Sequence, residues 1–403
     1  MRRPALGAGV RAFAYVLAGV ALVLSHRNVG LAGALVGLTG LALVFARPPR
    51  WTWPFLCVLA WLSLSSLWTP STDDVSWWWR LPGQMAFVAA TALVAARARP
   101  WEAAVFALAI LCGIALLGVE AVTGGAIRDL IPPTELPDKD DVASARGVGL
   151  GVQLLPAALL CLWRWRGDGR LTLGAGAAAL LCLSLGVWRF GVIANGLALA
   201  AALAAGALAY RRPARAPDLL LLAAGLFAVV PLLILLLPPP ETLEALSEGP
   251  LSWRQRLLAW RHVADAVTAS PTALLFGAGQ NAGTPLSVAL GPVLFPGAPI
   301  PIARVPDFAH DMPIQIFHEA GLVGLGLVVL GFVLAARTAR GRVWPPDLAA
   351  AGAALLAAWL VFALVDADFW ASWRWGALGL AVAGLRLARR ARPQAVVNLS
   401  PGR

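Results

Sequence analysis

The chain alternates long apolar runs with short polar connections through most of its 403 residues. About twenty mostly apolar residues are enough for an α-helix to cross a bilayer. On that criterion we expect about twelve spanning helices, at residues 8–25, 29–45, 51–67, 81–96, 102–122, 147–163, 171–187, 191–209, 219–237, 313–335, 348–365 and 369–387. No small-residue cleavage site follows the first run, so we expect it to remain as a helix. The predicted fold is all-α, a polytopic membrane protein whose residues 1–403 form a single integral membrane domain.

The longest polar interval, residues 238–312, separates the ninth and tenth apolar runs and is expected to form one long loop. Within it the sequence predicts a short amphipathic helix. Ser252 and Gln255 have the spacing of a capping box, so the helix is expected to begin at Ser252. It is expected to end at Ser270-Pro271, because proline disfavours the helical conformation of the residue before it. The Pro/Gly-rich residues that follow predict irregular structure.

One face of this helix carries Arg256, Trp260, Val263 and Val267 at the three- and four-residue spacing of a single stripe. An apolar face on a loop helix suggests that the helix lies on a membrane surface or on the ends of other helices. The arginine on that face has two interpretations, and both stay open. Either its stem covers apolar surface, or its guanidinium is an anion ligand that points into a cavity.

Composition supports the membrane assignment, since 59% of the residues are hydrophobic and only 13% are charged. The net charge is +11, and Lys139 is the single lysine, so the basic residues are almost all arginine. Arginine favours bidentate contacts with phosphate and carboxylate groups. No nucleic-acid-binding module is visible, and the basic charge is attributed to membrane topology. The cysteines lie in apolar runs without metal-ligand spacing, which is typical of small buried hydrophobes: Cys57, Cys112, Cys161 and Cys182.

The arginines predict the orientation. With both termini inside, every inner connection carries more than one arginine, as the positive-inside rule expects. Ten arginines break the rule on the outer side: Arg27, Arg80, Arg128, Arg146, Arg189, Arg254, Arg256, Arg261, Arg304 and Arg374. Arg146 ends an expected flexible flap at residues 123–146, and Arg189 lies in an expected tight turn at residues 187–190. Ionisable groups so close to spans are either interfacial anchors or functional residues.

His310 lies just before Pro313, at the expected outer mouth of the tenth helix. It is either a solvated or capping histidine or a general base, since histidine titrates near neutrality. His318 and Glu319 lack the second histidine that a zinc motif needs, and no acidic cluster indicates a divalent metal. Outer arginines suit a pyrophosphate leaving group, and a histidine can take the proton of an attacking hydroxyl. This combination outlines a glycosyl transfer from a polyprenyl pyrophosphate without a metal or other cofactor.

Several motifs resemble those of the O-antigen ligase and polymerase superfamily of integral membrane proteins. They are Ser252-x-x-x-Arg256-x-x-x-Trp260, Pro271…Gly277-x-Gly279 and Ala309-His310-Asp311…Gln315…Glu319-Ala320-Gly321-Leu322-Val323-Gly324, with Arg146-Gly147 and Arg189 at further arginine positions. The topology matches over most of the chain, but the specific motifs occupy only residues 256–324 and two short segments. Where members usually have Ser-Arg-Gly and His-Asn, this chain has Trp188-Arg189-Phe190-Gly191 and His310-Asp311.

The resemblance implies a bacterial inner-membrane enzyme with cytoplasmic termini and an active site that faces the periplasm. It would transfer O-antigen, with inversion, from undecaprenyl pyrophosphate to a sugar hydroxyl of the lipid A core. His310 would activate the acceptor, and Arg189, Arg256, Arg146 and Arg80 would hold the pyrophosphate. The expected partners are these two lipids and the membrane, with no nucleic acid, and the protein is expected to be a monomer. The alternatives are an O-antigen polymerase and a transporter or flippase of lipid-linked sugars. The single long loop makes the chain asymmetric, which counts against a transporter of two matching halves.

Overall fold

The structure is a computed structural model that describes residues 3–24, 29, 31–33, 35–36, 57, 60–61, 63–70, 98–130, 140–306, 309–365 and 371–391. The expected span at 81–96 lies outside these residues, as does most of the expected spans at 29–45 and 51–67.

Eight helical segments among the described residues are long and apolar enough to cross a membrane. They contain α1 (Arg3–Leu24), α6 (Pro100–Thr123), α8 (Asp140–Arg166), α9 (Gly169–Phe190), α10 (Ile193–Arg211), α11 (Asp218–Leu233), α16 (Met312–Arg340) and α17 (Pro346–Val365). The α11 segment includes two 3₁₀ turns, η4 (Pro213–Arg215) before the helix and η5 (Ile234–Leu236) after it. A further long helix, α18 (Ser372–Arg390), is not among these eight segments and carries several arginines. The prediction of an all-α, multi-pass membrane protein is confirmed in this form, while the number of twelve spans and their orientation stay predictions.

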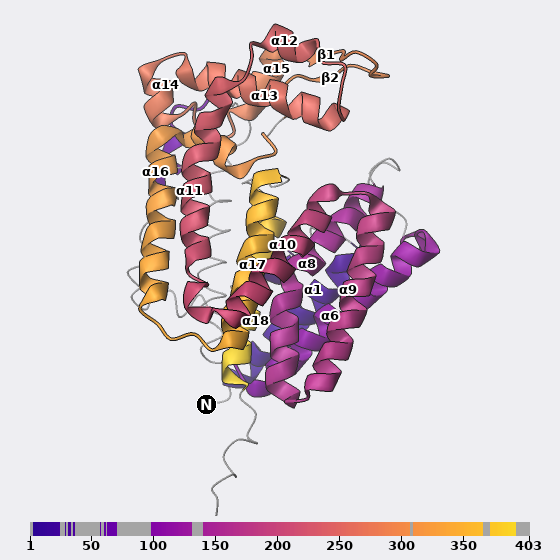
Figure 1. Cartoon of the computed structure of the whole chain (residues 1–403). Helices are drawn as coiled ribbons and strands as arrows, with labels where there is room; N and C mark the ends of the chain where they lie inside the picture. The colour runs from indigo at the N-terminus through magenta and orange to yellow at the C-terminus, as the bar shows by residue number, and fades with distance from the viewer. Residues whose placement is uncertain are drawn as a thin grey trace, which may run out of the picture.

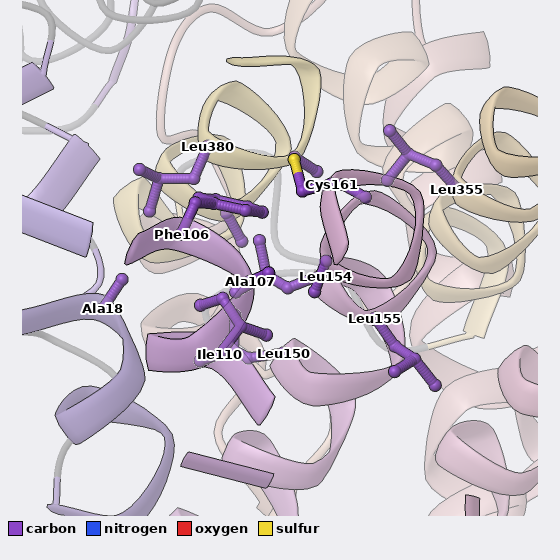
Figure 2. Packing of buried hydrophobic residues seen from close by; sticks show 14 of the residues in the cluster. Ala18, Phe106, Ala107, Ile110, Leu150, Leu154, Leu155, Cys161, Leu355 and Leu380 are labelled. Carbon is purple, nitrogen blue, oxygen red and sulfur yellow. The ribbon is translucent and has the colours of Figure 1, made fainter. Parts of the chain in front are cut away.

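The long helices form two groups that meet at α17 (Figure 1). The helices α11 and α16 lie side by side, and α17 separates them from the bundle of α1, α6, α8, α9, α10 and α18. Side chains of α6, α8 and α18 make the centre of the bundle, where Phe106, Ile110, Leu154 and Leu380 are fully buried (Figure 2). Glycines allow close approach: a Cβ on Gly113 would contact the backbone of Gly19 in α1.

The segment between α11 and α16 is folded and covers the ends of these two helices (Figure 1). It contains α12 (Pro240–Glu244), α13 (Leu251–Thr268), α14 (Pro271–Phe276), α15 (Gly283–Leu290) and the antiparallel pair of β1 (Pro292–Val293) and β2 (Ile302–Ala303). Leu243, Leu258, Val293 and Phe295 form a small core of its own. The prediction of one helix followed by irregular structure was therefore incomplete, because long-range packing orders the Pro/Gly-rich part. We call this end of the molecule the loop end and the other the opposite end.

The start of α13 differs from the prediction. The helix begins at Leu251 after Pro250, and no side chain caps it, so the capping box at Ser252 is wrong. Gln255 instead donates from Nε2 to the carbonyl of Ala303 in β2, at 2.8 Å. The predicted end is confirmed, since the helix stops at Thr268 and the Ser270 side chain caps α14 by accepting from the Ala273 amide. The Gln255 side chain, which the predicted capping box required, therefore makes a tertiary hydrogen bond instead.

Two further expectations about the loop end are corrected. Residues 123–146 are not a flap throughout, because α7 (Ala126–Leu130) follows α6 and α8 already begins at Asp140. Residues 187–190 are not a tight turn but the last turn of α9, which ends at Gly191 with a left-handed φ of 66°. Arg146 and Arg189 consequently lie on helices, where their positions are better defined than in connecting segments.

Candidate functional site

The site at the loop end is built around a break in α16. Gly321 has φ 62° and ψ −163°, a non-helical conformation that interrupts the hydrogen bonds of α16. The carbonyls of the preceding turn therefore need hydrogen-bond donors from outside the helix. The Ala278 amide donates to the His318 carbonyl at 2.8 Å, and the Gly279 amide donates to the Glu319 carbonyl at 3.1 Å. The indole of Trp61 donates to the Ala320 carbonyl at 3.1 Å. The connection from α14 to α15 is thereby attached to the break.

The first half of α16 is polar although it is buried. Asp311, Gln315, His318 and Glu319 expose 4% of their surface or less. Gln315 donates from Nε2 to Oε1 of Glu319 at 3.1 Å, one turn apart. Polar groups at this depth are costly and mark functional regions of membrane proteins. The half-helix between His310 and the break is therefore the strongest candidate region.

His310 is held between two anchors directly before this half-helix. On one side the carbonyl of Ala309 accepts from the Trp260 indole of α13 at 2.8 Å. On the other, Asp311 caps α16 by accepting from the Ile314 amide at 2.9 Å. The backbone of His310 has φ 53°, a left-handed conformation that is uncommon for residues other than glycine. The side chain is half-buried, and its Nδ1 atom is shielded from solvent. Strain that the surroundings impose in this way is a reason to suspect a functional role.

Arg256 brings positive charge to the same place. Its guanidinium lies over the Trp253 ring, 5.4 Å from the centroid. Burial raises the pKa of Asp311 to about 7, while the hydrogen bond from Ile314 and the positive charge of Arg256 act in the opposite direction. Arg256, Asp311 and His310 therefore form one cluster across α13 and the start of α16.

The apolar part of the α13 stripe packs as expected. Val263 and Val267 are buried with Ile314 and Phe317 of α16. The helix thus lies on the ends of α11 and α16, which confirms one of the two placements that the stripe predicted (Figure 1). This packing fixes the direction in which α13 presents Arg256.

A second group lies at the loop end of the bundle, on α8, α9 and α10. Asn195, 3% exposed, donates from Nδ2 to the Ala145 carbonyl at 2.7 Å, directly before Arg146. A Cβ on Gly186 would lie 2.6 Å from the Val148 side chain, so Arg189 and Arg146 belong to the same end of the α8–α9 pair. Both arginines are half-buried. The structure thus brings these two predicted site residues to one end of the bundle.

Arg374 is a candidate that the sequence interpretation did not assign to the site. Only 3% of its surface is exposed, and its guanidinium lies 4.2 Å from the centroid of Phe362 and 4.3 Å from that of Trp373. Phe362 lies 3.3 Å from the Cβ position of Gly149 in α8.

The residue after Arg374 places the start of α18 near the start of α16. Trp375 packs in one hydrophobic cluster with Met312 and Ile316 of α16. The start of α18 consequently lies between the Arg256–His310 cluster and the Arg146–Arg189 group. The signal for Arg374 in the sequence was its predicted position on the outer side, against the positive-inside rule. Its aromatic surroundings come partly from α17 and depend on packing.

Three other arginines of the loop make hydrogen bonds or ion pairs within it or with the end of α11. Arg254 donates to the carbonyls of Leu246 at 2.8 Å and Pro296 at 2.9 Å. Arg304 pairs with Glu244 at 2.7 Å, and this contact raises the pKa of its guanidinium. Arg261 pairs with Asp265 one turn along α13, at 2.5 Å. These contacts indicate a structural role for Arg254, Arg261 and Arg304, so fewer arginines of the loop are candidates for binding an anionic ligand.

Two parts of the sequence prediction cannot be placed on this site. Arg80 lies outside the described residues. Within the described ranges no three His, Cys, Asp or Glu side chains gather as a metal site would require. The absence of a metal or other cofactor from the reaction stays a prediction.

Comparison with known families gave no matching family model, and no curated protein has a significantly similar sequence. The likeness to the O-antigen ligase and polymerase superfamily therefore rests on the sequence motifs alone.

Proposed function

We propose that the protein is a membrane glycosyltransferase of the O-antigen ligase type. The observation that carries this proposal is the cluster of His310, Asp311 and Arg256, in which a histidine with a constrained backbone precedes an aspartate that the positive charge of Arg256 on the loop helix reaches. Arg374, Arg146 and Arg189 add positive charge at the same end of the molecule. On the positive-inside expectation this end faces the periplasm.

In the proposed reaction, an acceptor sugar hydroxyl of the lipid A core attacks the anomeric carbon of O-antigen linked to undecaprenyl pyrophosphate. His310 takes the hydroxyl proton as the new glycosidic bond forms. The bond between the anomeric carbon and the pyrophosphate oxygen breaks, and undecaprenyl pyrophosphate leaves. Attack opposite the leaving group inverts the anomeric configuration.

The arginines serve the leaving group. Negative charge grows on the pyrophosphate as its bond to the sugar breaks, and preorganised guanidinium groups stabilise that charge without a metal. Arg256 reaches the site from the loop, while Arg374 is held at the start of α18 by two aromatic rings. We assign Arg374 to this role together with Arg189, Arg256 and Arg146, and keep the sequence-based assignment of Arg80.

The test is a reconstituted reaction. The purified protein in lipid nanodiscs is incubated with undecaprenyl-pyrophosphate-linked polymer and lipid A core, and the products are separated by gel electrophoresis. We expect polymer to appear on the lipid A core and the lipid-linked donor to be consumed. Joining of two lipid-linked repeats instead would indicate a polymerase, and movement of an unconsumed donor across the bilayer would indicate a transporter.

A matched pair of variants tests the role of Arg374 in the same assay. Arg374→Gln should reduce transfer by about a hundredfold or more, as the loss of a charge-stabilising donor does in other enzymes. Arg211→Gln changes an exposed arginine at the opposite end and should transfer normally. Normal transfer by a folded Arg374→Gln variant would remove this residue from the site.

A further inference from the structure

A second concentration of arginines lies at the opposite end of the molecule. Arg164 at the end of α8, Arg342 between α16 and α17, and Arg389 at the end of α18 line a cavity of about 400 Å³ together with Trp344. Figure 1 shows the connection from α16 to α17 passing beside the end of α18. Three segments that are far apart in the sequence thus contribute one arginine each.

The charge of this cavity is unbalanced. Arg164 pairs with Asp347 at 2.6 Å, so this aspartate balances only one of the three arginines that line the cavity. The Nε atom of Arg164 is buried without an acceptor among the described residues. Arg386 adds a further positive charge that interacts with Arg342 and Arg389. Like charges so close together favour a bound anion, because each repels the others in its absence.

An apolar groove adjoins the arginine cavity. It has a volume of about 590 Å³ between α8, α9, α10 and α17, and its walls include Leu155, Leu159, Leu173 and Leu203. Asp347, the partner of Arg164, belongs to the wall of the groove. One ion pair is therefore the boundary between a cationic cavity and an apolar groove.

This boundary has the character of a membrane interface. Trp163 and Tyr210 line the groove near Asp347, and Trp344 lines the cavity. Tryptophan and tyrosine prefer the headgroup level of a bilayer. The order from the end of the molecule inward is thus arginines, aromatic residues and aliphatic residues, which matches the order of polarity within a phospholipid.

We propose that this is a binding site for a phospholipid with two phosphate groups, of the cardiolipin type, from the cytoplasmic leaflet. The phosphates bind Arg164, Arg342 and Arg389, and one acyl chain lies in the groove. Basic cavities between membrane helices on the cytoplasmic side suit such headgroups, and one aspartate among these arginines leaves more positive charge than a single phosphate neutralises. The site is at the opposite end from His310, so the proposal does not depend on the proposed reaction.

Binding is tested by native mass spectrometry of the detergent-solubilised protein. Cardiolipin, phosphatidylglycerol and phosphatidylcholine, all with oleoyl chains, are titrated separately. We expect cardiolipin to bind about tenfold more tightly than phosphatidylglycerol, and phosphatidylcholine not to be retained. Equal binding of cardiolipin and phosphatidylglycerol would overturn the assignment of two phosphates. Displacement of cardiolipin by an equal concentration of inorganic pyrophosphate would overturn a lipid ligand.

Variants locate the two parts of the site. Arg342 and Arg389 are exposed, so their replacement should leave folding intact. Arg342→Gln with Arg389→Gln should weaken cardiolipin binding about tenfold or more, whereas Arg211→Gln with Arg212→Gln, an exposed pair at the end of α10 and just after it that does not line the cavity, should not. Ala207→Phe fills the groove and should weaken binding, while Ala204→Phe, on α10 outside the groove wall, should not. Undiminished binding by the double glutamine variant or by Ala207→Phe would refute the proposed headgroup or chain position, respectively.

Discussion

Gly277 and Gly321 lie backbone to backbone where the loop crosses the break in α16. A Cβ on Gly321 would come 2.5 Å from the Gly277 amide nitrogen, and a Cβ on Gly277 would come 2.5 Å from the Ala320 amide nitrogen. Both glycines have positive φ, 78° for Gly277 and 62° for Gly321. Neither position can carry a side chain unless the loop moves away from the membrane helix.

Gly321→Ala should therefore separate the loop from the break and destabilise the protein. The left-handed backbone and the steric clash together should cost about 3 kcal/mol, measured as a lower thermal midpoint by intrinsic tryptophan fluorescence in detergent. Gly326→Ala is the matched control, because Gly326 is helical in the same element and a Cβ there meets nothing within 4 Å. It should be neutral or slightly stabilising. Equal midpoints for the two variants would contradict the importance of this contact.

His310→Ala should abolish transfer while the protein stays folded and inserted, since loss of a general base costs roughly a hundredfold or more. His310→Asn separates chemistry from backbone strain, because asparagine accepts the left-handed conformation that the position has. Both variants should be inactive with a near-normal thermal midpoint. His262→Ala on α13 is the control, and it should remain active. Near wild-type transfer by His310→Asn would exclude His310 as the base.

Arg189 and Arg256 lie on different elements and are both expected to bind the pyrophosphate. Lysine keeps the charge but loses the planar fork, so Arg189→Lys and Arg256→Lys should each impair transfer strongly. The double variant should lose less activation free energy than the sum of the single variants, because both residues act on one group. Transfer rates of the wild type and the three variants in single-turnover assays give these losses of activation free energy. Additive losses would indicate two separate sites.

Asp311 should make stability depend on pH in a particular window. Burial raises its folded pKa from 3.8 to about 7, so the folded state holds the proton more tightly than the unfolded state. Stability should therefore fall as the pH rises from about 4 to about 7 and level off above, by about 1.4 kcal/mol for each unit of pKa difference.

Asp311→Asn tests this expectation, since its amide oxygen can still cap α16 but cannot ionise. The difference between the thermal midpoints of the wild type and the variant should shift in favour of the variant as the pH rises through this window. Parallel midpoint curves would show that Asp311 does not titrate there.

Transfer should also survive metal removal. The proposed stabilisation of the leaving group uses arginines alone. Addition of EDTA to the reconstituted reaction should leave the initial rate unchanged. If chelation stops the reaction and magnesium or manganese restores it, the arginines do not act without a metal.

The sequence by itself determined the features that depend on local spacing. Runs of apolar residues predicted the membrane helices, and Ser270-Pro271 predicted the end of α13, because proline acts on its immediate neighbour. The positions of Arg189 and Arg256 against the expected charge rule were also visible, since that rule needs only a count along the chain.

Tertiary structure alone decided the break at Gly321, the difference between a structural Arg254 and a neighbouring Arg256, and the aromatic contacts of Arg374. Each depends on residues that are distant in the sequence. A buried carbonyl needs a hydrogen-bond donor, and where the helix is broken that donor must come from another part of the fold. The break at Gly321 is stable because Ala278, Gly279 and Trp61 donate to the carbonyls that the helix no longer satisfies. The spacing of residues along one helix carries no information about these hydrogen bonds, because their donors come from distant parts of the sequence.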